Sequence, residues 1–209
     1  MDSAPSSPAK PYGKAIGDLS GDDRPDLFIS SADGEGMYWY LYPDWQKYAF
    51  RTCGSWSEDC QLIDIDCDGD NDVINGNGQG LYWYENPLNT GGIIGAGKWT
   101  EHAIGSDGTN IHDLEIADLN GDVDMVLGNI WLENKGKGTD WEEHAYAGNK
   151  DVGDLWIEYT IESHITHIHG LAIGDFNKDG YLDIHTSIRH DHPGPRDHVS
   201  IWLSSGKEE

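Results

Sequence analysis

The sequence predicts an all-β fold made of four repeats of short strands. Glycine is abundant, with 27 residues in a chain of 209, and tryptophan (9) and tyrosine (10) outnumber phenylalanine (3). Aromatic strands joined by glycine-containing turns are typical of all-β domains. The remaining observation is an acidic loop that occurs four times along the chain, each time between two apolar segments.

The clearest copy of this loop is DIDCDGDND, residues 64–72, with acidic side chains at positions 1, 3, 5 and 9 and glycine at position 6. Ca²⁺ prefers six to eight oxygen ligands, which a tight loop of alternating carboxylates supplies, and glycine permits the sharp turn. Residues 18–26 and 175–183 keep the same spacing, whereas the copy at 118–124 is two residues shorter. The sequence therefore predicts three or four Ca²⁺ sites.

Each loop stands between segments that predict strands. The strands that enter the loops are expected at 15–18, 62–64, 114–118 and 171–175, and those that leave them at 27–29, 73–74, 125–127 and 182–184. A third strand is centred on a tryptophan in each repeat: Trp39, Trp83, Trp131 and Trp202. A fourth strand, with the pattern W-x-x-[YH]-A, is expected at 45–50, 99–104 and 141–146.

Four short strands per repeat, with 46, 54 and 57 residues between the first acids of successive loops, are typical of β-propeller blades. We expect blades at about 12–56, 57–105, 110–147 and 168–203, with a flexible N-terminal arm (1–11), an irregular insert (148–167) and a polar tail (204–209). The seven tryptophans at repeated positions are expected to pack between blades. His102 and His144 replace Tyr48 in the fourth-strand pattern, so we assign them to packing as well.

The fourth blade is expected to be incomplete, because nothing after Leu203 resembles a fourth strand. An unpaired strand edge offers free N–H and C=O groups to another chain. The chain is therefore expected to close as a small four-bladed ring, to be part of a larger propeller, or to form a homo-oligomer through this edge. Residues 156–161 alternate like a strand and are an alternative source of an extra edge.

The order of strand, acidic loop, strand and the segment GLYWYENP at 80–87 resembles the FG-GAP, or VCBS-type, repeat. That repeat builds the propellers of integrin α chains and of many secreted proteins, usually with seven blades. The resemblance covers about residues 12–203 and implies Ca²⁺ in the loops and an extracellular location, although residues 1–11 contain no apolar core of a signal peptide.

The ligands that the resemblance implies are side chains at positions 1, 3, 5 and 9 and the carbonyl at position 7. They are Asp18, Ser20, Asp22, Arg24 and Asp26; Asp64, Asp66, Asp68, Asp70 and Asp72; and Asp175, Asn177, Asp179, Tyr181 and Asp183. In the shorter loop the corresponding residues are Asp118, Asn120, Asp122 and Asp124.

A second cluster is rich in histidine, with seven of the ten histidines between residues 164 and 198. In a propeller blade these loops lie on the face opposite the acidic loops. The candidate ligand-binding residues there are His112, Asp113, His167, His169, Arg189, His190 and His192. Three interpretations stay open: histidines that stabilise turns, a binding face for an anionic ligand or a glycan, and a transition-metal or catalytic site.

These features favour an extracellular calcium-binding module that binds a glycan or a protein. The stretch 169–175 resembles aldos-2-ulose dehydratase-like and polysaccharide-lyase propellers, so a carbohydrate-active enzyme that uses the histidine face is one alternative. A structural subunit of an extracellular assembly is another. The net charge of −25 argues against nucleic acid as a partner, and no apolar stretch is long enough to predict a membrane span.

The three cysteines do not have zinc-finger spacing. Cys53 and Cys60 flank a short loop, and both a disulfide and two free thiols are compatible with this spacing. Cys67 lies inside the acidic loop at a position expected to point away from the ion.

Overall fold

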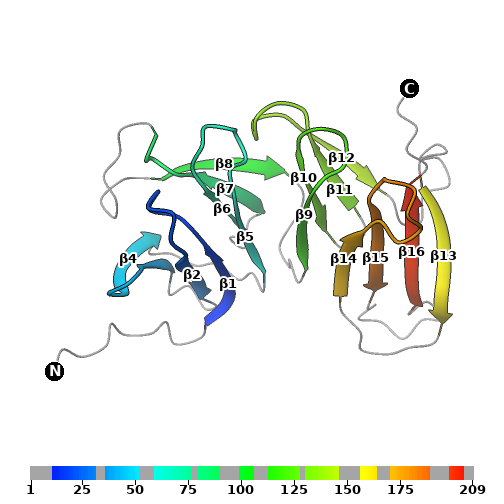
Figure 1. The fold of residues 1–209 in the computed structure, drawn as a ribbon, viewed down its shortest axis with the longest axis horizontal. Coiled ribbons are helices and arrows are strands. Elements are labelled where there is room, and N and C mark those ends of the chain that lie inside the picture. The colour runs from blue at the N-terminus through cyan, green and yellow to red at the C-terminus, as the bar shows by residue number, and fades with distance from the viewer. Residues whose placement is uncertain are drawn as a thin grey trace. The chain divides into compact units, whose positions relative to one another are not determined.

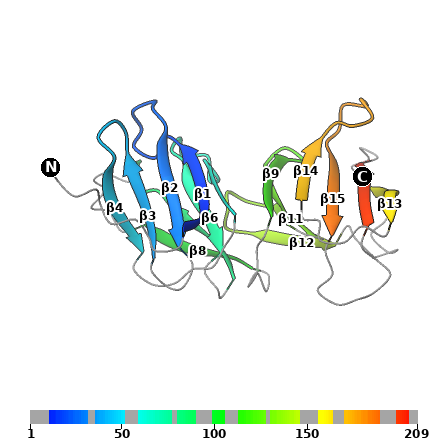
Figure 2. The same cartoon turned by 90° about the horizontal axis from the view of Figure 1, so that it is seen from below.

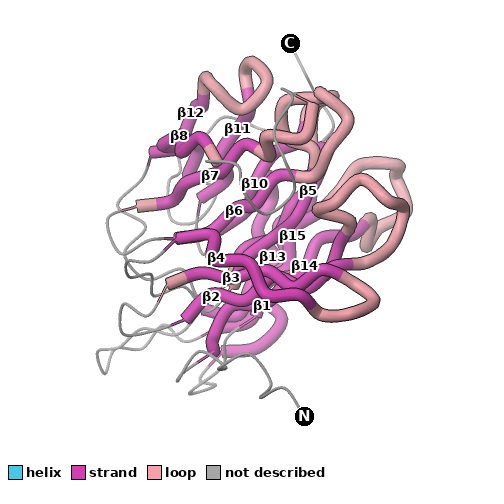
Figure 3. Tube along the Cα trace, turned by 90° about the vertical axis from the view of Figure 1, so that its left-hand side faces the viewer, coloured by secondary structure: helices cyan, strands magenta, loops and turns pink. Residues whose placement is uncertain are grey.

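The structure is a computed structural model of the chain. It describes residues 11–31, 36–51, 59–76, 80–89, 99–105, 113–127, 130–145, 156–163, 170–188 and 198–204. Within these ranges the chain forms strands and loops and no helix, which confirms the all-β prediction (Figure 3). It follows that no long apolar helix of the kind that crosses a membrane occurs in the described residues.

The strands form four sheets of four strands each, joined in an antiparallel manner (Figure 1). The first sheet has the order β1 (Pro11–Gly17), β2 (Asp26–Ser31), β3 (Met37–Leu41) and β4 (Gln46–Arg51). The second has the order β5 (Cys60–Ile63), β6 (Asp72–Gly76), β7 (Leu81–Glu85) and β8 (Thr100–Gly105). The third runs from β9 (Leu114–Asp118) through β10 (Val123–Leu127) and β11 (Ile130–Asn134) to β12 (Trp141–Ala145).

The fourth sheet corrects the prediction of an incomplete last blade. It contains β14 (Gly170–Gly174), β15 (Asp183–Ile188) and β16 (His198–Ser204), and its outer strand is β13 (Trp156–Ser163). The pairing of β13 with β16 is antiparallel and extends from Trp156 opposite Ser204 to Ser163 opposite His198. The missing strand therefore comes from earlier in the chain, within the expected insert 148–167. Because β16 is paired on this side, the reason for expecting a homo-oligomer through its edge is removed.

Two compact units are distinguished, one containing residues 1–112 and 135–141 and the other residues 113–134 and 142–209. The core of the first unit joins the first two sheets: Phe28, Met37 and Trp39 from one sheet and Val73 and Tyr84 from the other. Figure 2 shows β1 to β4 side by side in this unit. The core of the second unit contains Val126, Trp131, Ile184 and Trp202.

The third-strand tryptophans pack as predicted, since Trp39, Trp83, Trp131 and Trp202 are at most 8% exposed. The fourth-strand tryptophans do not all follow the prediction. Trp45 is 47% exposed, because it lies in the turn before β4, with a positive φ of 55°. By contrast, Trp99 packs against the core of the first unit.

A glycine carbonyl organises two indoles of the first unit. The backbone oxygen of Gly138 accepts hydrogen bonds of 2.8 Å from Nε1 of Trp83 and from Nε1 of Trp141. A Cβ atom at position 138 would lie 3.0 Å from Trp83 Cε2, and the φ of 73° falls in the left-handed region. Glycine is therefore required here for both space and backbone conformation.

Of the cysteines, Cys60 is a free thiol that is 2% exposed, and its burial raises its pKa. Cys53, with which the sequence allows either a disulfide or two free thiols, lies outside the described residues. Cys67 is free and exposed.

Candidate cation-binding loops

The flanking strands hold the two ends of every acidic loop in the same register. In each loop the residue before the first acid pairs with the last acid: Gly17 with Asp26, Ile63 with Asp72, Ala117 with Asp124 and Gly174 with Asp183. The two residues missing from the third loop are therefore lost from its interior, and there the strand pairing continues one residue further, to Asp118 opposite Val123.

The last acid of every loop is buried, and both of its carboxylate oxygens accept backbone hydrogen bonds. Asp72 is 1% exposed; its Oδ2 accepts from Ile65 N (3.1 Å) and its Oδ1 from Asn86 N (2.8 Å). The equivalent donors are Leu19 and Tyr42 for Asp26, Leu119 and Asn134 for Asp124, and Phe176 and Ser204 for Asp183. This carboxylate clamp joins the second residue of the loop to the end of the third strand.

From the sequence these four aspartates are expected only as cation ligands, and their role in the clamp is not predicted. A signal was present, because each is followed directly by an apolar strand that becomes part of the core. A carboxylate at that place is drawn out of water and needs hydrogen-bond donors. The shortened loop keeps the clamp, although its expected Ca²⁺ ligand spacing is lost.

Positive φ angles at positions 4 and 6 shape the three full-length loops. The values at these two positions are 74° and 64° for Gly21 and Asp23, 61° and 100° for Cys67 and Gly69, and 63° and 94° for Lys178 and Gly180. Each loop thus has one glycine and one non-glycine residue in the left-handed region. The prediction considered only glycine at position 6, whereas the first loop has its glycine at position 4.

Loops 64–72 and 175–183 share one hydrogen-bond network. Asp68 N donates both to Asp64 Oδ1 (3.0 Å) and to Asp66 Oδ1 (3.1 Å), and Gly69 N donates to Asp64 Oδ2 (3.0 Å). The same three bonds occur in the later loop, with Asp179 N donating to Asp175 and Asn177, and Gly180 N to Asp175. The side chains of positions 1 and 3 therefore converge on one backbone amide.

In loop 64–72 three carboxylates come together. One oxygen from each of Asp64, Asp66 and Asp72 lies within 4.8 Å of the other two. Burial raises the pKa of Asp72 to about 8, although hydrogen bonds from Asn86 and Ile65 lower it, and Asp66 and Asp70 raise it further. Burial also raises the pKa of Asp66, with the charge of Asp68 adding to the effect.

Asp70, at position 7 of the same loop, is a further buried carboxylate close to this group. Its side chain is 8% exposed, and Oδ2 accepts from Asn89 N (3.0 Å), while Oδ1 accepts no hydrogen bond from the described residues. Burial raises its pKa to about 6, and the neighbouring charges of Asp68, Asp66 and Asp64 raise it as well. Clustered carboxylates with an unsatisfied buried oxygen are costly when ionised, and a divalent cation would offset that cost. The residues of this loop therefore fit Ca²⁺.

Loop 18–26 stabilises its first carboxylate without a cation. Asp18 accepts backbone hydrogen bonds from Ser20, Gly21, Asp22 and Asp23. Burial raises the pKa of Asp18, but these four bonds together hold it below its ordinary value. Position 3 carries a serine hydroxyl, which donates to Asp18 Oδ1 (3.3 Å). This loop has fewer carboxylates to neutralise than loop 64–72.

In the shortened third loop, the side chain of Asn120 makes a hydrogen bond outside the loop. Its Nδ2 donates to Glu133 Oε1 of β11 (2.6 Å), while its Oδ1 accepts a weak bond from Asp122 N (3.4 Å). Asp118 accepts from Gly121 N, and burial raises the pKa of Asp124 to about 6.

The packing role predicted for His102 and His144 is confirmed, and each histidine has a further partner. The ring of His102 stacks on Trp83 at 4.2 Å and that of His144 on Trp131 at 4.3 Å. In the first sheet, Tyr48 stacks on Trp39 at 4.7 Å. Sequence reasoning missed that the two imidazoles also bind glutamates: Nε2 lies 2.8 Å from Glu85 Oε2 in one sheet and from Glu133 Oε2 in the other.

The histidine-rich face lies almost entirely outside the described residues. This applies to His112, His167, His169, Arg189, His190 and His192. Asp113 is described and is partly buried. The three interpretations of this face therefore stay predictions.

Comparison of the chain with known protein families gives no matching family, and comparison with curated proteins gives no matching relative.

Proposed function

We propose that this chain is a calcium-binding β-propeller module, in which Ca²⁺ bound by loop 64–72 stabilises the fold. The observation that carries the proposal is the convergence of Asp64, Asp66 and Asp72 in the same loop as Asp70, whose Oδ1 accepts no hydrogen bond from the described part of the chain. Without a cation, the ionised form of such a group is unfavourable. A hard cation that prefers oxygen ligands would stabilise it. Loop 175–183 shares the hydrogen-bond network and is the second proposed site.

The propeller part of the proposal is supported by the repeated architecture. Every sheet has four strands, and in each the acidic loop joins two adjacent strands. Within the first unit β1 packs beside β5, and within the second unit β9 packs beside β14. Side-by-side packing of the equivalent strand from successive sheets is what blades of a propeller require.

We place the module outside the cell as part of the same proposal, with a glycan or a protein as its ligand. Loops of this type in extracellular modules bind Ca²⁺ with dissociation constants of about 10⁻⁴–10⁻³ M. Calcium would then act as a structural component that holds the loops of one face in place.

Calorimetric titration of the full chain with Ca²⁺ tests the proposal, with Asp66→Ala as the variant of the main site. The Asp66 side chain is only partly buried and is not part of the clamp, so its loss removes a ligand without opening the core. The matched control is Asp122→Ala in the shortened loop. We expect Asp66→Ala to remove at least one equivalent of bound Ca²⁺ and Asp122→Ala to leave that equivalent unchanged. A parent chain that binds no Ca²⁺ would refute the proposal.

A further inference from the structure

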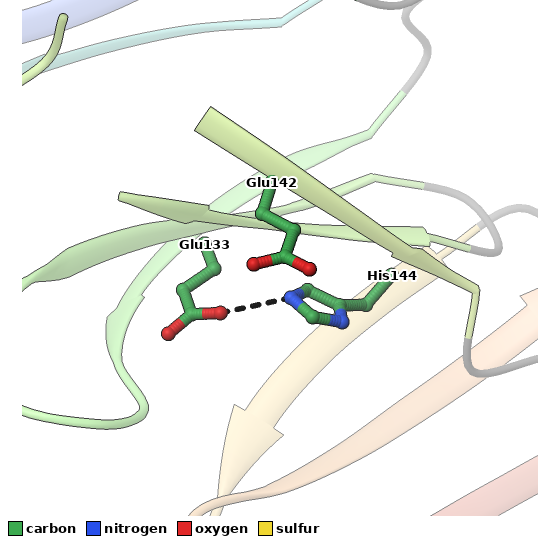
Figure 4. Close-up of side chains that lie close together, drawn as sticks. All are labelled: Glu133, Glu142 and His144. Atoms are coloured by element: carbon green, nitrogen blue, oxygen red, sulfur yellow. Dashed lines mark hydrogen bonds and ion pairs between the residues drawn. The ribbon is translucent and has the colours of Figure 1, made fainter. Parts of the chain in front are cut away.

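The third sheet contains a group of possible metal ligands outside the acidic loops. Glu133 on β11 and Glu142 and His144 on β12 each contribute one ligand atom, and these atoms lie within 4.8 Å of one another. Figure 4 shows the two carboxylates and the imidazole converging. We propose that Glu133, Glu142 and His144 form a binding site for a transition-metal ion of the Zn²⁺ class.

Strand geometry explains why these side chains meet. Residues two apart on a strand point to the same face, so Glu142 and His144 share one face of β12, and Trp131 and Glu133 share one face of β11. The ring of His144 stacks on Trp131 with an interplanar angle of 15°. The indole therefore fixes the ring plane and directs Nε2 toward Glu133.

Glu133 is held from both sides. Its Oε2 is bonded to His144 Nε2 at 2.8 Å, and its Oε1 accepts from Asn120 Nδ2 at 2.6 Å. The side chains of Glu133 and His144 are 14% and 25% exposed, whereas Glu142 is exposed. Two ligands are thus preorganised, and the third lies at the exposed side of the site, where water can fill the remaining coordination positions.

The chemistry of the donors favours zinc over calcium. Zn²⁺ takes imidazole nitrogen and carboxylate oxygen at about 2.0–2.2 Å, which places its ligand atoms roughly 3.0–3.6 Å apart. The 2.8 Å between His144 Nε2 and Glu133 Oε2 would widen slightly as the ion replaces their hydrogen bond, and one oxygen of Glu142 lies within 4.8 Å of both atoms. Calcium prefers oxygen ligands alone. Zn²⁺ at Nε2 would replace the hydrogen bond to Glu133, so the neutral imidazole would carry its proton on Nδ1, and the ion would offset the negative charge of the two carboxylates.

The second sheet provides an internal comparison, because it repeats the arrangement without the third ligand. His102 stacks on Trp83 and bonds Glu85 at 2.8 Å, as His144 does with Trp131 and Glu133. Directly opposite Glu85 on β8 is Thr100, at the place in the W-x-x-H pattern that Glu142 occupies in the third sheet. The second carboxylate is thus what distinguishes a site from a packed histidine.

The test is titration of the full chain with ZnCl₂ in saturating Ca²⁺, so that the acidic loops are occupied. Glu142→Thr copies the second sheet, and His144→Tyr copies the Trp39–Tyr48 stack of the first sheet, so both variants are expected to fold. Melting curves without Zn²⁺ check that they do. We expect each variant to weaken Zn²⁺ binding at least tenfold at one site, and His102→Tyr to leave that site unchanged.

A gain-of-function variant in the second sheet provides a second test of the Zn²⁺ site. Thr100→Glu supplies the missing carboxylate beside Glu85 and His102 and is expected to add one equivalent of bound Zn²⁺. The proposal is overturned if the parent binds no Zn²⁺ in the presence of Ca²⁺, or if folded Glu142→Thr and His144→Tyr bind it as tightly as the parent. It is also overturned if His102→Tyr loses the same site.

Discussion

Asp72 and Asn86 are joined by a hydrogen bond of 2.8 Å from the backbone N–H of Asn86 to Oδ1 of Asp72. The side chain of Asn86 extends this link, since its Nδ2 donates to Leu19 O (3.1 Å) and to Asn71 O (2.9 Å). One contact point therefore connects the end of β7, the acidic loop of the second sheet and the acidic loop of the first. The same backbone-to-carboxylate bond recurs in the other three sheets, which makes the clamp a structural element independent of any cation.

The clamp predicts that Asp72→Asn destabilises the fold even without Ca²⁺. An amide replaces one acceptor by a donor that faces a backbone N–H, and each buried donor left without an acceptor costs about 1–3 kcal/mol. We expect the free energy of unfolding to fall by about 2–4 kcal/mol. Urea denaturation in chelator measures this.

Asp68→Asn is the matched control for the clamp. Asp68 lies in the same loop but is exposed, and its Oδ1 acceptor for Asp70 N is retained in the amide. Its expected cost in chelator is within about 0.5 kcal/mol. Equal destabilisation by the two variants would contradict a role for Asp72 beyond that of its charge.

The raised pKa values predict the pH dependence of the cation-free chain. The folded-state pKa values of Asp72 (about 8), Asp70 (about 6) and Asp124 (about 6) lie above the ordinary value of 3.8. The folded state therefore holds more protons than the unfolded state between about pH 4 and pH 8. The resulting stabilisation is fully present below pH 4 and is lost as pH rises through 6 and 8.

Urea denaturation between pH 5 and pH 8 in cation-free buffer checks this sign. Saturating Ca²⁺ should reduce the fall in stability, because the cation favours the ionised carboxylates. Asp70→Asn removes one of the titrating groups while keeping an acceptor for Asn89 N, so it should lessen the slope and stabilise the cation-free chain at pH 8. A stability that increases with pH over this window would refute the assignment.

Much of the fold follows from local patterns, and this explains what the sequence could predict. The apolar segments around each acidic loop became strands, and the third-strand tryptophans are buried. The pairing of β13 with β16 was missed because it joins segments about 40 residues apart and because the outer strand precedes the other three in the chain, whereas in the other sheets it follows them. No repeat pattern carries that information.

The candidate cation-binding loops were also predicted only in part, because strand register cannot be read from a local pattern. The acidic ligands of loop 64–72 follow from spacing, but the clamp and the contact between His144 and Glu133 depend on strand register. The exposure of Trp45 does not follow from the W-x-x-[YH]-A pattern. The pattern is the same in three sheets, but Trp45 precedes its strand, which begins at Gln46.

The close packing of Gly138 against Trp83 predicts that a side chain at position 138 destabilises the first unit. Gly138→Ala would place a Cβ atom 3.0 Å from the buried Trp83 ring. It would also force an alanine into the left-handed region, at a φ of 73°. Overpacking and a left-handed backbone together cost about 2–4 kcal/mol. Gly136→Ala, in the same turn with nothing within 4 Å of the added Cβ, is the control and should be near neutral. Thermal melting of the two variants measures the difference, and similar melting temperatures would contradict the packing described for Trp83.

We propose that Ca²⁺ in the acidic loops, above all in loop 64–72, stabilises this fold. The most direct test of this proposal is thermal melting of the full chain at neutral pH with saturating Ca²⁺ and with excess chelator. A cation at a hundred times its dissociation constant contributes about 2.7 kcal/mol per site, which corresponds to an increase of roughly 5–10 °C for a chain of this size. We predict at least that increase with Ca²⁺, and its reduction in Asp66→Ala. Equal melting temperatures with Ca²⁺ and with chelator would contradict the account.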